Sequence, residues 1–221
     1  MLLQILFIAA VLFSIFCSIF VQVTFAKYRN KRNVKGLTGQ QVARIILDKN
    51  GLTDVPVYSG SGSLTDHFDP RDNSITLSES VYGSDSIGSV AVAAHEVGHA
   101  IQHARGYTPL VLRSAFAPVA QVASRAWVVV IVLGAVLSVM NFYLIGAVLF
   151  GIMLVFQLVT LPVEFDATGR ALRTLSYDGY LNADEMKGAR SVLSAAAMTY
   201  VSAAILTLIQ LLRFLAVLNR R

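Results

Sequence analysis

The segment Ala93-Ala94-His95-Glu96-Val97-Gly98-His99-Ala100-Ile101-Gln102 combines small apolar residues with two histidines and a carboxylate. It lies within residues 86–103, whose many alanines and valines predict a buried helix. Ser84, Asp85 or Ser86 is available to cap the start of that helix. Burying two imidazoles and a carboxylate without partners is costly, so these three polar residues require an explanation.

Helical spacing offers a metal site as that explanation. Residues four apart lie on one face of a helix, so His95 and His99 can bind the same ion. Glu96 would lie beside them, where a carboxylate can accept a proton from a metal-activated water molecule. The alternative is a pair of hydrogen-bonded core histidines with Glu96 in an ion pair. We favour a zinc hydrolase, with His95 and His99 as metal ligands and Glu96 as the catalytic base.

The composition is typical of a membrane protein. Of the 221 residues, 55% are hydrophobic and 14% are charged, and the mean hydropathy is +0.63. The net charge of +5 comes from basic residues that flank apolar segments, so we expect a lipid bilayer as partner and no nucleic acid. The single cysteine, Cys17, excludes a disulfide framework and a thiolate zinc site, which leaves histidine and carboxylate as ligands.

Apolar segments divide the chain into five parts. Residues 2–26 carry no charge and exceed the length needed to cross a bilayer, and they lack the basic start and the cleavage site of a signal peptide. The predicted parts are a transmembrane anchor over 1–26, a cytoplasmic part over 27–117, a transmembrane hairpin over 118–163 that turns at Asn141 and Phe142, a connector over 164–191 and a last transmembrane helix over 192–221.

Basic residues predict the orientation of these spans. Five of them follow the first span directly, namely Lys27, Arg29, Lys31, Arg32 and Lys35, and the positive-inside rule places such clusters in the cytoplasm. We therefore expect a multi-pass protein of the cell membrane, with its N-terminus outside. The hairpin then brings Glu164 back to the cytoplasmic side, where the two histidines lie.

The cytoplasmic part shows both helix and strand signals. Residues 38–50 predict a short amphipathic helix with Thr38 as its cap and Gly51 after its end. Short strands are predicted at 55–58, 60–63 and 74–77, with a turn over 69–73. The expected fold is a mainly α membrane protein with about four transmembrane helices and a small cytoplasmic α+β, zincin-like metallopeptidase domain.

Glu164 is the predicted third metal ligand, because a catalytic zinc usually takes three protein ligands and a water molecule. A carboxylate at the membrane end of a polar helix needs a partner, and Arg170 or Arg173 is the alternative to a metal. Asp166 is the next candidate ligand. We expect His103 to be exposed or hydrogen-bonded, and the role of His67 is left open.

Several segments together resemble the YugP-like neutral zinc metallopeptidases of bacterial membranes. They are residues 64–71, residues 77–79, residues 93–102, residues 161–165 and residues 188–190. A more distant resemblance is to the HtpX and CAAX prenyl proteases, whose ligand glutamate stands in a Glu-x-x-Ala-Asp context. Glu164 and Ala167 match that pattern, but Thr168 replaces the aspartate that would orient a ligand histidine. A weaker hydroxyl contact, or Asp66 or Asp166, would have to take its place.

The sequence therefore favours a zinc metalloendopeptidase that acts on a protein or peptide substrate, most simply a membrane protein. His67, Tyr107, Arg170 and Arg173 are the candidates for stabilising the oxyanion. An alternative is a non-catalytic membrane scaffold or chaperone with a structural zinc site. A transporter with a metal site is a weaker alternative, because the apolar spans hold almost no ionisable residues.

Overall fold

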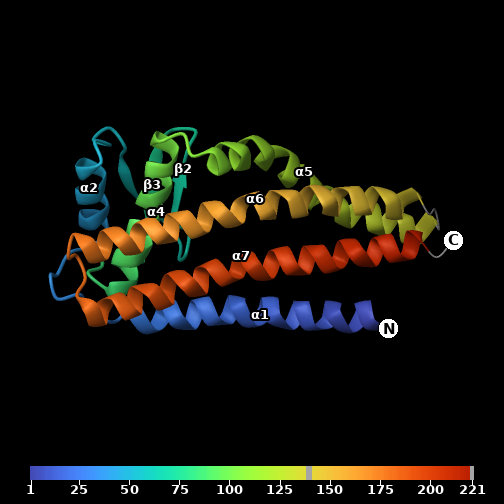
Figure 1. The fold of residues 1–221 in the computed structure, drawn as a ribbon, viewed down its shortest axis with the longest axis horizontal. Helices are drawn as coiled ribbons and strands as arrows, with labels where there is room; N and C mark the ends of the chain where they lie inside the picture. Colours follow the sequence, from blue (N-terminus) through green and yellow to red (C-terminus); the bar gives the residue numbers. More distant parts are fainter. Residues whose placement is uncertain (138–140, 220–221) are drawn as a thin grey trace. The chain divides into compact units, whose positions relative to one another are not determined.

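The computed structural model describes residues 1–137 and 141–219 (Figure 1). Its elements are α1 (Leu2–Tyr28), α2 (Gly39–Lys49), β1 (Val57–Gly60), β2 (His67–Asp69), β3 (Ser74–Ser78), α3 (Glu79–Tyr82), α4 (Ile87–Ala104), α5 (Thr108–Leu137), α6 (Asn141–Tyr177) and α7 (Ala183–Leu218). The chain is mainly helical and forms two units. One unit holds residues 19–108 and 163–197, and the other holds the start of α1, residues 109–162 and α7 from Met198 onward.

The first unit contains a three-stranded sheet in the order β1-β3-β2. The central strand, β3, pairs in parallel with β1 and antiparallel with β2, so that Ile75 lies opposite both Val57 and Phe68. Ile75 and Leu77 form the apolar side of this strand, and both are fully buried because that side meets the core.

The two helices beside the sheet begin and end where the sequence predicts. Thr38 and Gln41 form a reciprocal capping box at the start of α2, and Gly51 follows its end with a positive φ of 73°. Ser86 caps α4 through the backbone N–H of Ser89. These caps satisfy backbone N–H groups that have no partner within their helices, and the cap at Ser86 does so in the interior.

Helix α4 lies in the middle of this unit's core. It contacts α2, α3, β2 and β3. Its buried positions include Val90, Ala94 and Val97, and the cluster around them takes in Leu175 of α6 and Val192 of α7. A helix that is buried on nearly every side must carry its polar residues for a reason other than solvation.

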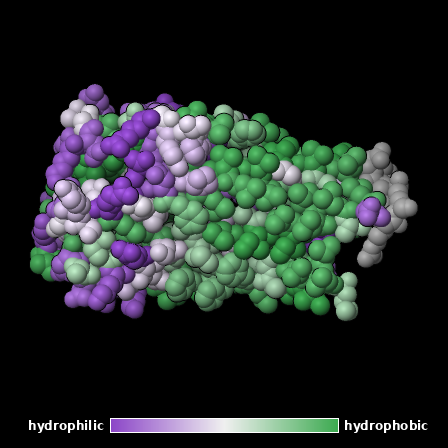
Figure 2. Space-filling model, in the orientation of Figure 1, coloured by the Kyte–Doolittle hydropathy of each residue, from purple (hydrophilic) through white to green (hydrophobic). Residues whose placement is uncertain are grey.

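The second unit consists of long apolar helices. Four helices of the described chain are long and apolar enough to cross a membrane, over Leu2–Tyr28, Thr108–Gly134, Phe142–Tyr177 and Ala183–Leu218. On the face seen in Figure 2, this unit is mostly hydrophobic, whereas the other unit presents many hydrophilic residues. Phe150 lies between Trp127 and Phe214, with 5.3 Å between ring centroids in each pair. An apolar outer surface is what a bilayer requires.

Several element boundaries differ from those predicted. Helix α5 begins at Thr108 and continues through Pro118, where we placed the start of the hairpin. Asn141 and Phe142 belong to α6, so the turn predicted there is wrong, and residues 138–140 between the helices lie outside the described residues. Residues 60–63 form no strand beyond Gly60, while β2 was not predicted. Pro118 and Pro162 both lie inside helices, so neither proline marks a helix end.

Candidate metal centre

Helix α4 presents His95 and His99 on one face, one turn apart. Their ring centroids are 4.7 Å apart and the ring planes lie at 84° to each other. His99 is buried and His95 is partly buried. The i, i+4 spacing therefore brings both imidazoles close together on one face of α4, as the sequence predicts.

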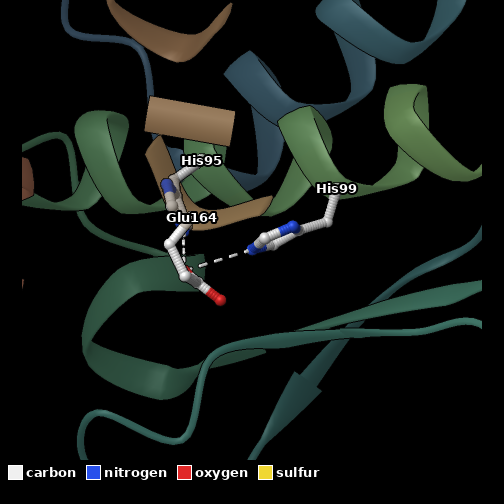
Figure 3. Close-up of side chains that lie close together, drawn as sticks. All are labelled: His95, His99 and Glu164. Carbon is white, nitrogen blue, oxygen red and sulfur yellow. Dashed lines mark ion pairs between the residues drawn. The ribbon is translucent and has the colours of Figure 1, made fainter. Parts of the chain in front are cut away.

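Glu164 reaches the same point from α6. Its Oε2 atom lies 3.3 Å from His95 Nε2 and 3.7 Å from His99 Nε2. Figure 3 shows the three side chains pointing toward one another from the two helices. One ligand atom from each lies within 4.8 Å of the others, and the Glu164 side chain is only 2% exposed. The structure thus brings the three predicted ligands together.

Glycine at position 98 allows α6 to come this close to α4. A β-carbon built on Gly98 would lie 2.9 Å from the carbonyl oxygen of Ala167 and 3.2 Å from its Cα. Both contacts are with backbone, which cannot rotate away as a flexible side chain can. Ala167 follows Glu164 by three residues on α6, so the same close approach brings Glu164 to the histidines.

A chain of hydrogen bonds extends from His99 away from the other two ligands. His99 Nδ1 lies 3.0 Å from Gln102 Oε1. Gln102 Nε2 donates to the carbonyl oxygen of Val163 and to Asp166 Oδ2, each at 2.8 Å. Asp166 in turn forms an ion pair with Arg170, and it is not a member of the cluster of possible ligands. Second partners of this kind fix the orientation of metal-binding histidines.

His95 has a weaker partner. Its Nδ1 atom lies 3.4 Å from the hydroxyl oxygen of Thr168. The expected hydroxyl contact is therefore present, although it is long for a hydrogen bond. Asp66 instead accepts hydrogen bonds from the backbone and side chain of Ser78.

Electrostatics favour the charged form of His99 when no metal is bound. Burial lowers the pKa of the ring, but the hydrogen bond with Glu164 and the negative charges of Glu96 and Glu164 outweigh it. The pKa of His99 is therefore raised above its usual value. A metal ion would take the place of this proton and meet the same negative charges.

The remaining candidates take different positions. Glu96 is buried on α4 next to His95 and is not one of the three clustered ligands. His103 is exposed and stacks on Phe68 of β2 at 5.5 Å, in agreement with the expectation that it is not a ligand. His67 is also exposed, and its Nδ1 lies 2.8 Å from the carbonyl oxygen of Thr65.

Two arginines were considered as partners of Glu164 or as oxyanion groups. Arg170 pairs with Asp166 and lies over the ring of Tyr107 at 6.0 Å, so it is not the partner of Glu164. Arg173 is exposed. Of the two arginines, Arg170 therefore has Asp166 as its ion-pair partner.

Sequence reasoning missed Gln102 and the role of Gly98. Gln102 lies three residues after His99, which places it on the same helical face, and a polar residue there in an apolar helix was the available signal. The close approach at Gly98 depends on α6, which is more than 60 residues away in the sequence. No local pattern identifies such a neighbour.

The clustered residues fit a zinc ion. Two imidazoles and one carboxylate form a ligand set of catalytic zinc, which keeps a fourth position for water. The three ligand atoms converge in a buried place, where they are held by two packed helices. A preformed site of this kind lowers the cost of arranging the ligands around the ion.

Comparisons with known proteins agree with this chemistry. A family model described as "putative neutral zinc metallopeptidase" matches residues 3–219. A protein of Bacillus subtilis (strain 168) named "putative membrane protease YugP" is 45% identical over 215 residues, which cover 97% of this chain and 96% of that protein. No solved structure matches the chain. The chain therefore belongs to the neutral zinc metallopeptidase family that this model describes.

Proposed function

We propose that this protein is a membrane-bound zinc endopeptidase with its active site on α4 and α6. The observation that carries the proposal is the convergence of His95, His99 and Glu164 within 4.8 Å of one another. The family match and the membrane protease relative support the same reaction class.

Each residue of the site has a role in this proposal. His95, His99 and Glu164 would hold the zinc ion. When bound, zinc polarises the scissile carbonyl and lowers the pKa of a water molecule to about 7. Glu96 would accept the proton of that water and pass it to the leaving amine, a role worth roughly 10² to 10⁴ in rate. The buried position of Glu96 beside His95 suits this role.

The outer edge of β2 is the proposed binding site for an extended substrate. Among the described strands, β2 pairs only with β3, so its other edge is available to a peptide. Phe68 of β2 touches His103, one turn beyond His99 on α4. A peptide paired with β2 would therefore run beside the metal helix, with backbone hydrogen bonds providing affinity.

We propose that substrates are membrane proteins or the segments next to their spans. Glu164 directly follows Pro162 and Val163, which end the long apolar part of α6. A site at this position would meet the cytoplasmic surface of the bilayer if residues 27–35 are cytoplasmic. The basic cluster supports that orientation.

The proposal is tested by comparing purified wild-type protein with the Glu96→Gln variant. Bacterial membrane proteins reconstituted with each enzyme would be searched by mass spectrometry for new peptide termini. We expect new termini with the wild type, none with Glu96→Gln, and equal zinc content in the two proteins, because Glu96 is not a ligand. Glu79→Gln, an exposed glutamate on α3, is the matched control and should cleave as the wild type does.

Two results would contradict the proposal. Equal cleavage by the wild type and Glu96→Gln would show that Glu96 is not the catalytic base. Full restoration of a deletion strain's phenotype by Glu96→Gln would favour the non-catalytic scaffold or chaperone.

A further inference from the structure

Gln102 is a buried amide in the interior of α4. Its side chain has no exposed surface, and its neighbours on the helix are apolar except for His99 and His103. A buried amide is costly unless its donors and acceptor are satisfied, and Gln102 satisfies them with groups at the metal centre.

The partners of Gln102 determine which way its amide points. Nε2 contacts the carbonyl oxygen of Val163 and Asp166 Oδ2. A carbonyl only accepts hydrogen bonds, and the Asp166 carboxylate is held in its ionised form by Arg170 at 2.5 Å. Both neighbours therefore need the NH₂ group, and the opposite orientation would place an oxygen against two acceptors.

The orientation of the amide in turn determines the tautomer of His99. Gln102 Oε1 faces His99 Nδ1 at 3.0 Å and can only accept, so Nδ1 must carry the proton. The neutral ring then has its lone pair on Nε2, the atom that faces Glu164 at 3.7 Å. That lone pair is the one that a metal requires.

We propose that Gln102 is a positioning residue that holds His99 in its metal-binding tautomer and orientation, and that Asp166 and Arg170 anchor its amide. This inference rests on the proposed zinc site. The two histidines then differ in the partner of Nδ1, since the contact of His95 Nδ1 with the Thr168 hydroxyl is longer, at 3.4 Å, than the 3.0 Å contact of His99 Nδ1 with Gln102. Loss of such a second partner typically lowers metal affinity by about 10- to 100-fold.

The first test replaces Gln102 by methionine, which has a similar length and no amide. Zinc affinity of the detergent-purified protein would be measured by competition with a chromophoric chelator. We expect Gln102→Met to weaken zinc binding by about 10- to 100-fold. The visible absorption spectrum of the cobalt-substituted protein should change as well, because it reports the ligand geometry. Thr168→Val should have a smaller effect on both, because the contact it removes is the weaker one.

A second pair of variants keeps the inference testable if Gln102→Met fails to fold. Gln102→Glu can still accept from His99 Nδ1, but it places a carboxylate against Asp166 and the Val163 carbonyl. Adding Asp166→Asn supplies an NH₂ donor between the two side chains. We expect Gln102→Glu to lose zinc affinity, and we expect the affinity of the double variant to be at least tenfold higher than that of Gln102→Glu.

The outcomes separate this inference from the proposed function. Failure of the wild-type protein to bind zinc would overturn the metal site itself. Zinc binding by the wild type with an unchanged affinity and cobalt spectrum in Gln102→Met would overturn only the role of Gln102. Equal losses in Gln102→Glu and the double variant would also contradict that role.

Discussion

A β-carbon on Gly98 would lie 2.9 Å from the carbonyl oxygen of Ala167, so a glycine at this position lets α6 reach α4. Gly98→Ala must therefore push the two helices apart or strain them. We expect this variant to fold and to bind zinc at least tenfold more weakly, because Glu164 moves away from the histidines. Zinc titration of the purified protein checks this.

Gly169→Ala is the matched control, since Gly169 lies on α6, the helix that Gly98 of α4 approaches, and a β-carbon there meets nothing within 4 Å. Its zinc affinity should equal that of the wild type, and its helix should gain slightly in stability. Equal zinc binding by Gly98→Ala and Gly169→Ala would show that the close approach does not matter for the site.

Glu164 and Asp166 should behave differently although they are two residues apart. Glu164→Gln replaces a charged ligand by a neutral amide, so zinc content should fall well below one ion per chain. Asp166→Asn should retain the metal, because Asp166 contacts Gln102 and Arg170 and not the ligand cluster. Metal analysis of both purified variants checks this. Loss of zinc in Asp166→Asn together with retention in Glu164→Gln would show that Asp166, and not Glu164, is the third ligand.

Zinc binding should weaken in acid. The proton on His99 must leave when the metal binds, and its pKa is raised above the ordinary imidazole value of about 6.5. Below that raised pKa, affinity should fall roughly tenfold per pH unit for each proton displaced. Zinc titrations between pH 5 and 9 should show the decline beginning above 6.5; an affinity that is flat down to pH 5 would contradict it.

In the metal-free protein, the contribution of His99 to folding stability should have the opposite pH dependence and be largest in acid. The pKa of His99 is higher in the folded state than in the unfolded state, so protonation of His99 stabilises the fold. This stabilisation is fully present at a pH below the pKa that His99 has in the unfolded chain. It is lost as the pH rises through the folded value. Thermal unfolding of the chelator-treated protein, compared with His99→Ala, isolates this contribution.

Cysteine labelling tests the orientation in the membrane. Val34 is 81% exposed in the basic segment after α1, and Leu2 is 68% exposed at the start of that helix. In a Cys17→Ala background, we expect Leu2→Cys to react with an impermeant reagent added to intact cells and Val34→Cys to react only after lysis. Labelling of Val34→Cys from outside would place the unit that holds His95, His99 and Glu164 on the exterior. Asn33 is unsuitable for this purpose, because its buried side chain bonds to Leu37 and Asp85.

Much of the site could be predicted because its signals are local. The spacing of His95 and His99 and the cap at Ser86 follow from the helical repeat, and both are present. Glu164 was identified by the cost of leaving a carboxylate alone beside an apolar span. Strand β2 has no comparable local signal, since it spans only His67–Asp69 and is stabilised by pairing with β3.

Tertiary contacts determine the features that the sequence does not reveal. The start of α5 at Thr108 differs from the predicted start of the hairpin near Pro118, and a proline can lie inside a long apolar helix. The anchoring of Gln102 depends on Val163 and Asp166, which belong to another helix. Such partners are visible only once α4 and α6 are packed together.

The most direct test of the metal centre is anomalous X-ray scattering at the zinc edge from crystals of the purified protein. The account predicts one anomalous peak per chain, about 2.0–2.2 Å from His95 Nε2, His99 Nε2 and a carboxylate oxygen of Glu164. A peak bound by other residues, or no peak in protein purified with zinc, would contradict the metal centre and the peptidase proposed from it.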